Sequence, residues 1–169
     1  MMTIRDFLTC QKGAAAAEMA LIAPLAVLLF FTAVETGHYF YSQHQLVKAV
    51  RDGARFGARH SFDEVNCRNG SPFIAADLQN NIRAVALTGH LSGANETRSG
   101  WDSNEVSFAV TVTCPTVIEA TSGIYETDEP APIINVAATI GYDSLFNGLG
   151  IISDNYSLNA NQQASAMGI

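Results

Sequence analysis

The sequence GAAAAEMALIAP, residues 13–24, places a glycine, a single carboxylate and a proline at the start of an otherwise apolar run. On insertion scales a carboxylate costs about 2.5 to 3.5 kcal/mol when it reaches the centre of a bilayer. A segment that crosses a membrane with Glu18 in it therefore either uses that carboxylate or keeps it at the membrane edge.

The apolar run predicts a single membrane span. No charged residue lies from Met19 to Val34, but a helix of that length rises only about 24 Å, against roughly 30 Å of hydrocarbon. The membrane-spanning helix must therefore include residues on either side of this run. Residues 14–17 add a turn on one side, and the aromatic residues 39–41 are typical of a membrane interface on the other.

The helix is expected to continue well beyond the span. Between Ala14 and about Arg59 the only strong helix-breaking residues are one proline and three glycines, so one helix of about 68 Å is the simplest prediction. In its second half, basic residues recur at three- and four-residue steps on one face: Lys48, Arg51, Arg55 and Arg59. A stripe of small residues allows close contact with another helix: Ala49, Gly53 and Gly57.

The rest of the chain predicts a small mixed domain. Ser71 and Pro72 are expected to open a second helix that ends near Gly89. Alternating apolar residues predict a strand over 105–114, and two further strands are expected over 133–142 and 156–166. Residues 60–71 are rich in turn formers, 93–104 are expected to form a loop, and 122–132 an acidic turn or hairpin connection. The predicted fold class is α+β: a long N-terminal transmembrane helix that extends into an extracytoplasmic cap with a second helix and a short antiparallel sheet.

The charges are unevenly distributed. The formal net charge is −7, and residues 60–169 hold 3 basic and 12 acidic side chains. This balance argues against nucleic acid as a partner, because Lys and Arg must neutralise phosphates for such binding. An acidic surface is more often a solubility device.

The cysteines indicate the orientation. Cys10 precedes the span, whereas Cys67 and Cys114 both follow it, and a pair on an extracytoplasmic side predicts a disulfide that excludes Cys10. The positive-inside rule taken alone favours the opposite orientation, because Arg5 and Lys12 precede the span and four basic residues follow it. Those four lie 14 or more residues beyond the span, which reduces their weight.

Three blocks of sequence resemble the TadE-like pseudopilins of the tight-adherence (Tad, or Flp) branch of type IV pilus systems. The first is Gly13 followed by residues 18–24, although this chain has Met19 where the family usually has an aromatic residue. The second is residues 35–38, similar to a Glu-x-Gly-Arg pattern with His38 in place of the arginine. The third is residues 49–58, which look like the end of the family's helix nearly residue for residue.

The resemblance implies processing and assembly. It implies a leader over residues 1–13, cut by a prepilin peptidase between Gly13 and Ala14, a helical segment over 14–60 and a cap over 61–169. It also implies a minor or pseudopilin role in the inner membrane, with the N-terminus cytoplasmic and the cap periplasmic or extracellular. The implied partners are other pilins and pseudopilins, the inner-membrane assembly platform and the lipid bilayer.

Two residues near the cleavage site have a functional and a plain interpretation. Glu18 would pair inside the bilayer with the new α-amine of a neighbouring subunit, or it would sit at the headgroup level of an ordinary anchor. Pro24 removes the helix hydrogen bond to the Ala20 carbonyl and would loosen the helix during assembly, or it is a tolerated kink.

The basic face in the second half of the helix also has two interpretations. It would bind lipid headgroups or an acidic partner, or it is simply solvated.

No enzymatic activity, cofactor or metal site is predicted. The four histidines lack metal-ligand spacing, and no His-Glu-x-x-His, Gly-x-Ser-x-Gly or Cys-x-x-Cys pattern occurs. Three acids at 126, 128 and 129 would suit calcium but more often form a solvated loop.

Three functions are compatible with these observations. The first is a pseudopilin of a Tad pilus used in surface adherence. The second is a permanent single-pass anchor whose acidic ectodomain binds a partner. The third is a secreted binding domain released after a signal peptide that ends near Ala33. The mature N-terminus separates them: Ala14, Met1 or a residue near Glu35.

Overall fold

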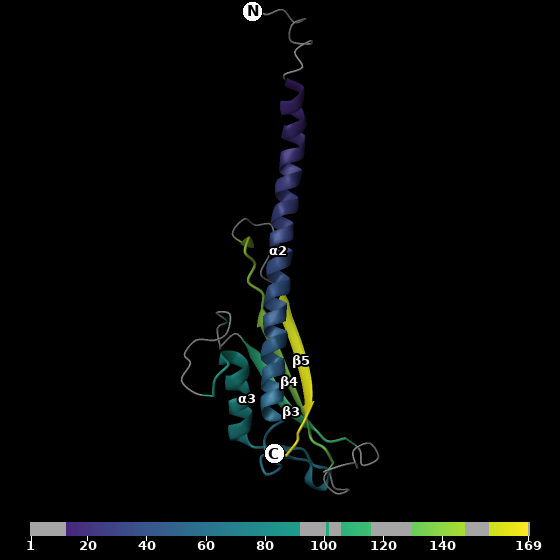
Figure 1. Ribbon diagram of the computed structural model, residues 1–169, viewed down its shortest axis with the longest axis vertical. Coiled ribbons are helices and arrows are strands. Elements are labelled where there is room, and N and C mark those ends of the chain that lie inside the picture. Colours follow the sequence, from purple (N-terminus) through teal and green to yellow (C-terminus); the bar gives the residue numbers. More distant parts are fainter. Residues whose placement is uncertain (1–12, 92–100, 102–105, 116–129, 148–155, 169) are drawn as a thin grey trace, which may run out of the picture. The chain divides into compact units, whose positions relative to one another are not determined.

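The computed structural model describes residues 13–91, 101, 106–115, 130–147 and 156–168. The chain divides into two compact units, residues 1–38 and 39–169. Helix α2 (Ala14–Gly57) begins in the first unit and ends in the second, as Figure 1 shows. The predicted long helix is confirmed, and it ends two residues before the expected position.

The described part of the first unit is the first half of α2. Its large apolar side chains are exposed on all sides: Met19, Leu21, Ile22, Leu25, Val27, Leu28, Leu29 and Phe30. By length and composition α2 is able to cross a membrane, and none of its apolar stretch is buried. The hydroxyls of Thr32 and Thr36 each donate to the carbonyl four residues earlier, at 2.7 Å, so both are satisfied within the helix.

The second unit contains a three-stranded antiparallel sheet of order β3-β4-β5. The strands are β3 (Ser107–Thr113), β4 (Ile133–Gly141) and β5 (Ser157–Ser165). In the register Val110 lies opposite Val136, which lies opposite Gln162. All three predicted strands are confirmed to within two residues at each end.

The two faces of this sheet differ in chemistry. One face supplies buried apolar side chains, chiefly from alternate positions of the central strand: Ile134, Val136, Ala138 and Ile140. The other face carries uncharged polar side chains that pair across strands. Asn135 donates to the Thr113 hydroxyl and Thr139 to the Asn159 amide oxygen, each at 2.7 Å.

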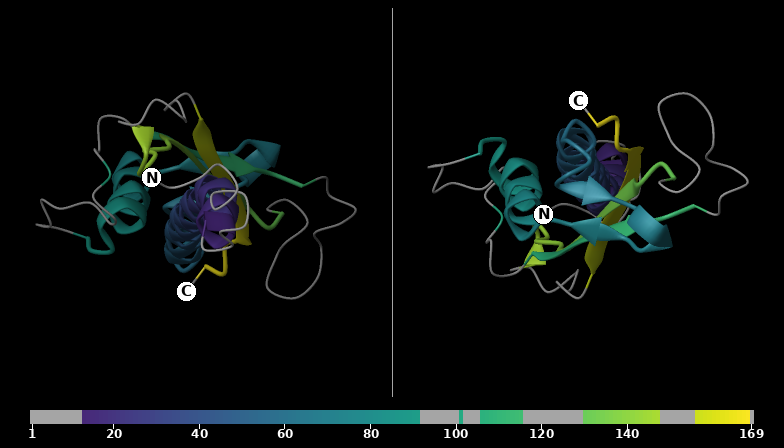
Figure 2. Two further views of the ribbon diagram at one scale, coloured as in Figure 1. Left: turned by 90° about the horizontal axis from the view of Figure 1, so that it is seen from above. Right: turned by 90° about the horizontal axis from the view of Figure 1, so that it is seen from below.

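Helix α3 (Ala76–Thr88) packs closely against the second half of α2 on the apolar side of the sheet, as Figures 1 and 2 show. A Cβ built on Gly53 would lie 3.1 Å from the Ala86 Cβ and 3.3 Å from the Ile82 carbonyl oxygen. A Cβ on Gly57 would lie 2.7 Å from the Ile82 Cδ1. Gly53 and Gly57 of the small-residue stripe therefore lie against α3, which is the close helix contact that the sequence indicated.

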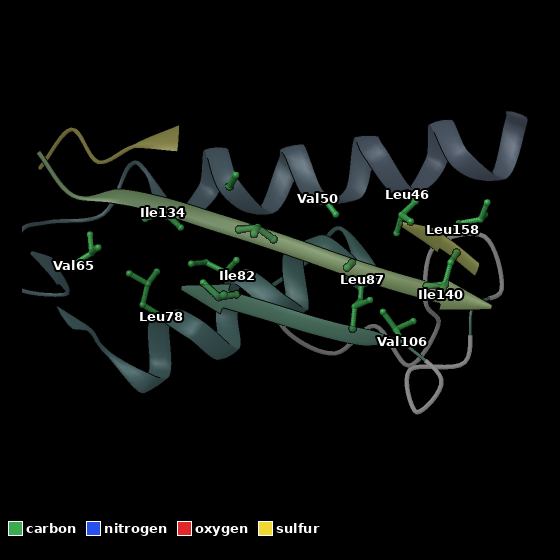
Figure 3. Packing of buried hydrophobic residues seen from close by; sticks show 14 of the residues in the cluster. Leu46, Val50, Val65, Leu78, Ile82, Leu87, Val106, Ile134, Ile140 and Leu158 are labelled. Carbon is green, nitrogen blue, oxygen red and sulfur yellow. The ribbon is translucent and has the colours of Figure 1, made fainter. Parts of the chain in front are cut away.

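The core of the second unit lies between the two helices and the sheet (Figure 3). Each element contributes side chains that are almost completely buried. Leu46 and Val50 come from α2, Leu78 and Ile82 from α3, and Ile134 from β4. Because each large aliphatic side chain contributes about 1.5 to 3 kcal/mol when fully buried, this cluster is the main source of the unit's stability.

The predicted start of the second helix is wrong. Ser71 and Pro72 do not cap α3, because they lie in a small hairpin between β1 (Val65–Asn66) and β2 (Phe73–Ile74). The turn of this hairpin holds Asn69 and Gly70 at φ of 55° and 70°, and the helix begins only at Ala76. Its end is as predicted, at a left-handed Gly89 whose N–H donates to the Val85 carbonyl.

A disulfide joins Cys67, just after β1, to Cys114, just after β3. The two Cα atoms are 5.6 Å apart, and the bridge closes a loop with a sequence separation of 47. It links the small hairpin to the main sheet, which confirms the predicted pairing. The predicted loops at 93–104 and 122–132 fall largely outside the described residues.

The segment after β5 is bonded to two other parts of the unit. The Ala166 N–H donates to the Pro132 carbonyl at 2.9 Å, and the Met167 N–H to the Ala58 carbonyl at 2.8 Å. Gly168, at a φ of 64°, lies against the Phe62 ring so closely that a Cβ would overlap it. Residues 166–168 are therefore part of the folded unit.

Replacing Gly53 by leucine should destabilise the second unit by about 1 to 3 kcal/mol, because the new side chain meets the α3 backbone, which cannot move aside as a side chain can. The measurement is chemical denaturation of the full chain in detergent, followed by the loss of sheet signal. Gly37→Leu is the control, since a Cβ at Gly37 has no described atom within 4 Å. Equal stability of the two variants would contradict the close packing of α2 and α3.

Replacing Cys67 and Cys114 by serine should lower the free energy of unfolding by about 4 kcal/mol in the chain-entropy model of a loop this long. Non-reducing peptide mapping of protein from the native envelope should recover the linked pair. Cys10→Ser is the control and should change neither result. Free thiols at both positions in the native protein would refute the bridge and also weaken the orientation predicted from the sequence.

Candidate functional site

The residues of the predicted cleavage site lie at the very start of α2. Gly13 immediately precedes the helix, Ala14 is its first residue, and Glu18 lies one turn further on. Pro24 is inside the helix, which continues through it without a break. Gly13, Ala14, Glu18 and Pro24 thus occupy less than four turns of one helix, in agreement with their spacing in the sequence.

Packing against the described residues does not require a glycine at position 13. A Cβ built at this position has no described atom within 4 Å, and Gly13 is not among the residues with a positive φ. In contrast, Gly53, Gly57 and Gly168 each have neighbours that a side chain would meet. Neither sterics nor backbone geometry in the described chain requires a glycine at position 13, and the same holds for Gly37 and Gly141.

Glu18 is an exposed carboxylate on an otherwise apolar surface. Three of its apolar neighbours along the helix are more than half exposed: Met19, Leu21 and Ile22. No described residue forms a salt bridge with Glu18. If this surface lies in lipid, the carboxylate needs a partner that this chain's described residues do not supply.

The disulfide is separate from this segment. Cys67 is completely buried in the second unit, and its partner Cys114 follows β3. The bridge therefore belongs to the stability of the cap, and the predicted site residues form two groups: the start of α2 and the disulfide. Cys10 lies outside the described residues.

The basic face of α2 is solvent-exposed along its length. The four side chains Lys48, Arg51, Arg55 and Arg59 are all exposed and form no salt bridge with any described residue. Two ion pairs occur nearby in the same unit, His60 with Glu64 at 2.8 Å and Arg68 with Asp63 at 3.2 Å. Arg55 and Arg59 also border a groove of about 320 Å³ between the end of α2 and the end of β5. The sequence indicated the basic face but not this groove.

Within the described residues, no three side chains of His, Cys, Asp or Glu come together in a way that could hold a metal ion. The acidic turn around residues 126–129, considered for calcium, lies outside them.

Comparison with known proteins supports the interpretation of the helix. Neither the search of curated proteins nor that of solved structures found a match. A family model does match, and the matched segment begins at Gly13 and ends two residues before the end of α2. The matched segment includes the first two blocks of sequence that resemble the family, and all but the last three residues of the third block, residues 49–58. The cap lies outside the matched segment. Over residues 13–55, this chain matches the family of TadE-like proteins.

Proposed function

We propose that this chain is a pseudopilin of a Tad pilus system. A prepilin peptidase cuts it after Gly13, and the mature chain is held in the inner membrane by α2 with the cap on the extracytoplasmic side. It then joins or primes a pilus that serves surface adherence. Its partners are the peptidase, other pilins and pseudopilins, the assembly platform and the lipid bilayer.

The observation that carries this proposal is the combination at the start of α2. The family match begins at Gly13, and this glycine has no packing or backbone requirement in the described chain. A peptidase that needs a small residue at the cut explains why a glycine stands there. The exposed apolar helix that follows is able to span a membrane, and the disulfide suits an oxidising compartment for the cap.

Glu18 has a specific part in this proposal. Cleavage creates a positively charged α-amine on Ala14, and each subunit then carries one buried cation and one buried anion near the same end of the helix. Both ions are costly in lipid when alone, and pairing between adjacent subunits offsets much of that cost. Because the α-amine of Ala14 exists only after cleavage, this ion pair makes the contact between subunits depend on prior cleavage.

Cleavage after Gly13 predicts that the mature chain begins at Ala14, and removal of 13 of the 169 residues leaves 156. Intact mass and N-terminal sequencing of protein from envelopes test this. Gly13→Trp should keep the full-length form in the membrane, while Gly37→Trp, at another glycine with open space around it, should be cut normally. A mature start at Met1 would favour the permanent anchor, and one near Glu35 the secreted domain.

Replacing Glu18 by leucine should permit insertion and cleavage but block assembly, because the span becomes more apolar while a neighbour's amine loses its partner. Processing should remain complete, while adherence and co-purification with other pilus components should fall by at least about tenfold, as expected when a buried charge loses a partner worth several kcal/mol. Thr36→Leu, at a polar residue satisfied within its own helix, is the control. Wild-type adherence and co-purification by the Glu18→Leu protein would show that Glu18 is only an interfacial residue.

A further inference from the structure

We propose that the groove bordered by Arg55 and Arg59 receives the surface around Asp143 of a second copy of this chain. We call these two surfaces the basic groove and the Asp143 surface. The inference concerns the folded cap and does not depend on cleavage after Gly13, so the two can succeed or fail separately.

The basic groove combines two cations with an apolar floor. It lies between the end of α2 and the end of β5, and its lining consists of Arg55, Ala58, Arg59, Ala164, Ser165 and Met167. Met167 is 56% exposed, which is high for a large apolar side chain. Both guanidinium groups are exposed and without an acidic partner in the described chain. Such a site suits a carboxylate next to an apolar side chain, since an arginine can hold a carboxylate through two parallel hydrogen bonds.

The Asp143 surface has the complementary chemistry. Asp143 follows β4, is exposed and has no salt bridge to a described residue. Two exposed apolar side chains flank it, Leu145 at 53% and Tyr156 at 60%. The backbone bond from the Tyr142 N–H to the Tyr156 carbonyl, 2.8 Å, holds the two chain segments together.

Other exposed acids of the described cap are less suitable. Asp63 and Glu64 already pair with Arg68 and His60. Asp77 lies in the first turn of α3, where a negative charge already interacts favourably with the helix dipole. Among these carboxylates of the described cap, Asp143 is therefore the one that a cation from another molecule would stabilise most.

The two surfaces lie at opposite ends of the second unit. β5 runs in the same direction as α2, because Gln43 donates to the Asn159 carbonyl at one end and Met167 donates to the Ala58 carbonyl at the other. β4 is antiparallel to β5, so its last residue lies at the Gln43 end. There the Tyr142 ring packs on that of Tyr39, with centroids 5.2 Å apart.

This separation determines the kind of assembly. Sixteen residues of helix separate Tyr39 from Arg55, a rise of about 24 Å. A contact in which one copy uses its basic groove and the next copy uses its Asp143 surface is heterologous. After each copy is added, one basic groove and one Asp143 surface at the two ends of the assembly remain unused. Copies joined in this way are staggered along the helix axis and form an open row.

The test is a charge swap in the full chain, purified in a nonionic detergent so that no anionic headgroup is present. The groove variant carries Arg55→Glu and Arg59→Glu, and the second variant carries Asp143→Arg. Sedimentation velocity measures self-association at low salt. We expect the wild type to associate, each variant alone to associate at least about tenfold more weakly, and an equal mixture of the two variants to recover association, because each then offers the charge that the other needs.

A matched control carries Lys48→Glu with Arg51→Glu, which changes the net charge as much as the groove variant but at exposed positions of α2 that do not line the groove. It should associate like the wild type, and thermal unfolding should show that all variants remain folded. Monomeric wild type, unchanged association of either variant, equal loss in the control, or failure of the mixture to recover would each overturn the proposal. Because none of these measurements involves the peptidase, none of them bears on the cleavage site.

Discussion

The folded unit depends on the close approach of α2 and α3 at two glycines. Gly53 and Gly57 let Ile82 and its turn of α3 come within van der Waals distance of the α2 backbone. That approach brings the apolar faces of both helices onto the same face of the sheet, where Ile134 contacts the end of α2. A larger residue at either glycine would separate the helices and open the cluster that the sheet covers.

The two halves of the long helix therefore require different surroundings. In its first half the apolar side chains point outward all round, which suits a surrounding of lipid or other apolar helices. In its second half one side is buried against α3 and the sheet, while the other side carries Lys48, Arg51 and Arg55, which form no salt bridge with a described residue. The family match covers both halves of the helix, to within two residues of its end, and does not extend into the cap.

Much of this fold was predictable because its strongest signals are local. The uncharged run after Glu18 indicates the exposed half of α2, the apolar residues at every second position around Val110 indicate a strand, and the spacing of Gly53 and Gly57 indicates a helix contact. The start of α3 was not predictable in the same way. A serine followed by a proline is a good local signal for a helix start, but pairing of Phe73 and Ile74 with β1 is a tertiary interaction that overrides it. The candidate site was similarly divided: Gly13 and Glu18 stand out in the sequence, whereas the basic groove needs β5 beside α2, which no local pattern reveals.

The bonds made by residues 166–168 have a consequence for the order of folding. Leu158 and Ala166 are core residues, and the backbone of Met167 is bonded to the end of α2 more than a hundred positions earlier. Because these contacts join distant parts of the chain, the cap cannot complete its core while residue 168 is still in the ribosome. Until then, the edge of β4 that β5 will cover is free to pair with other chains. A chaperone or early partner that shields this edge would protect the chain at the stage when it is most prone to aggregate.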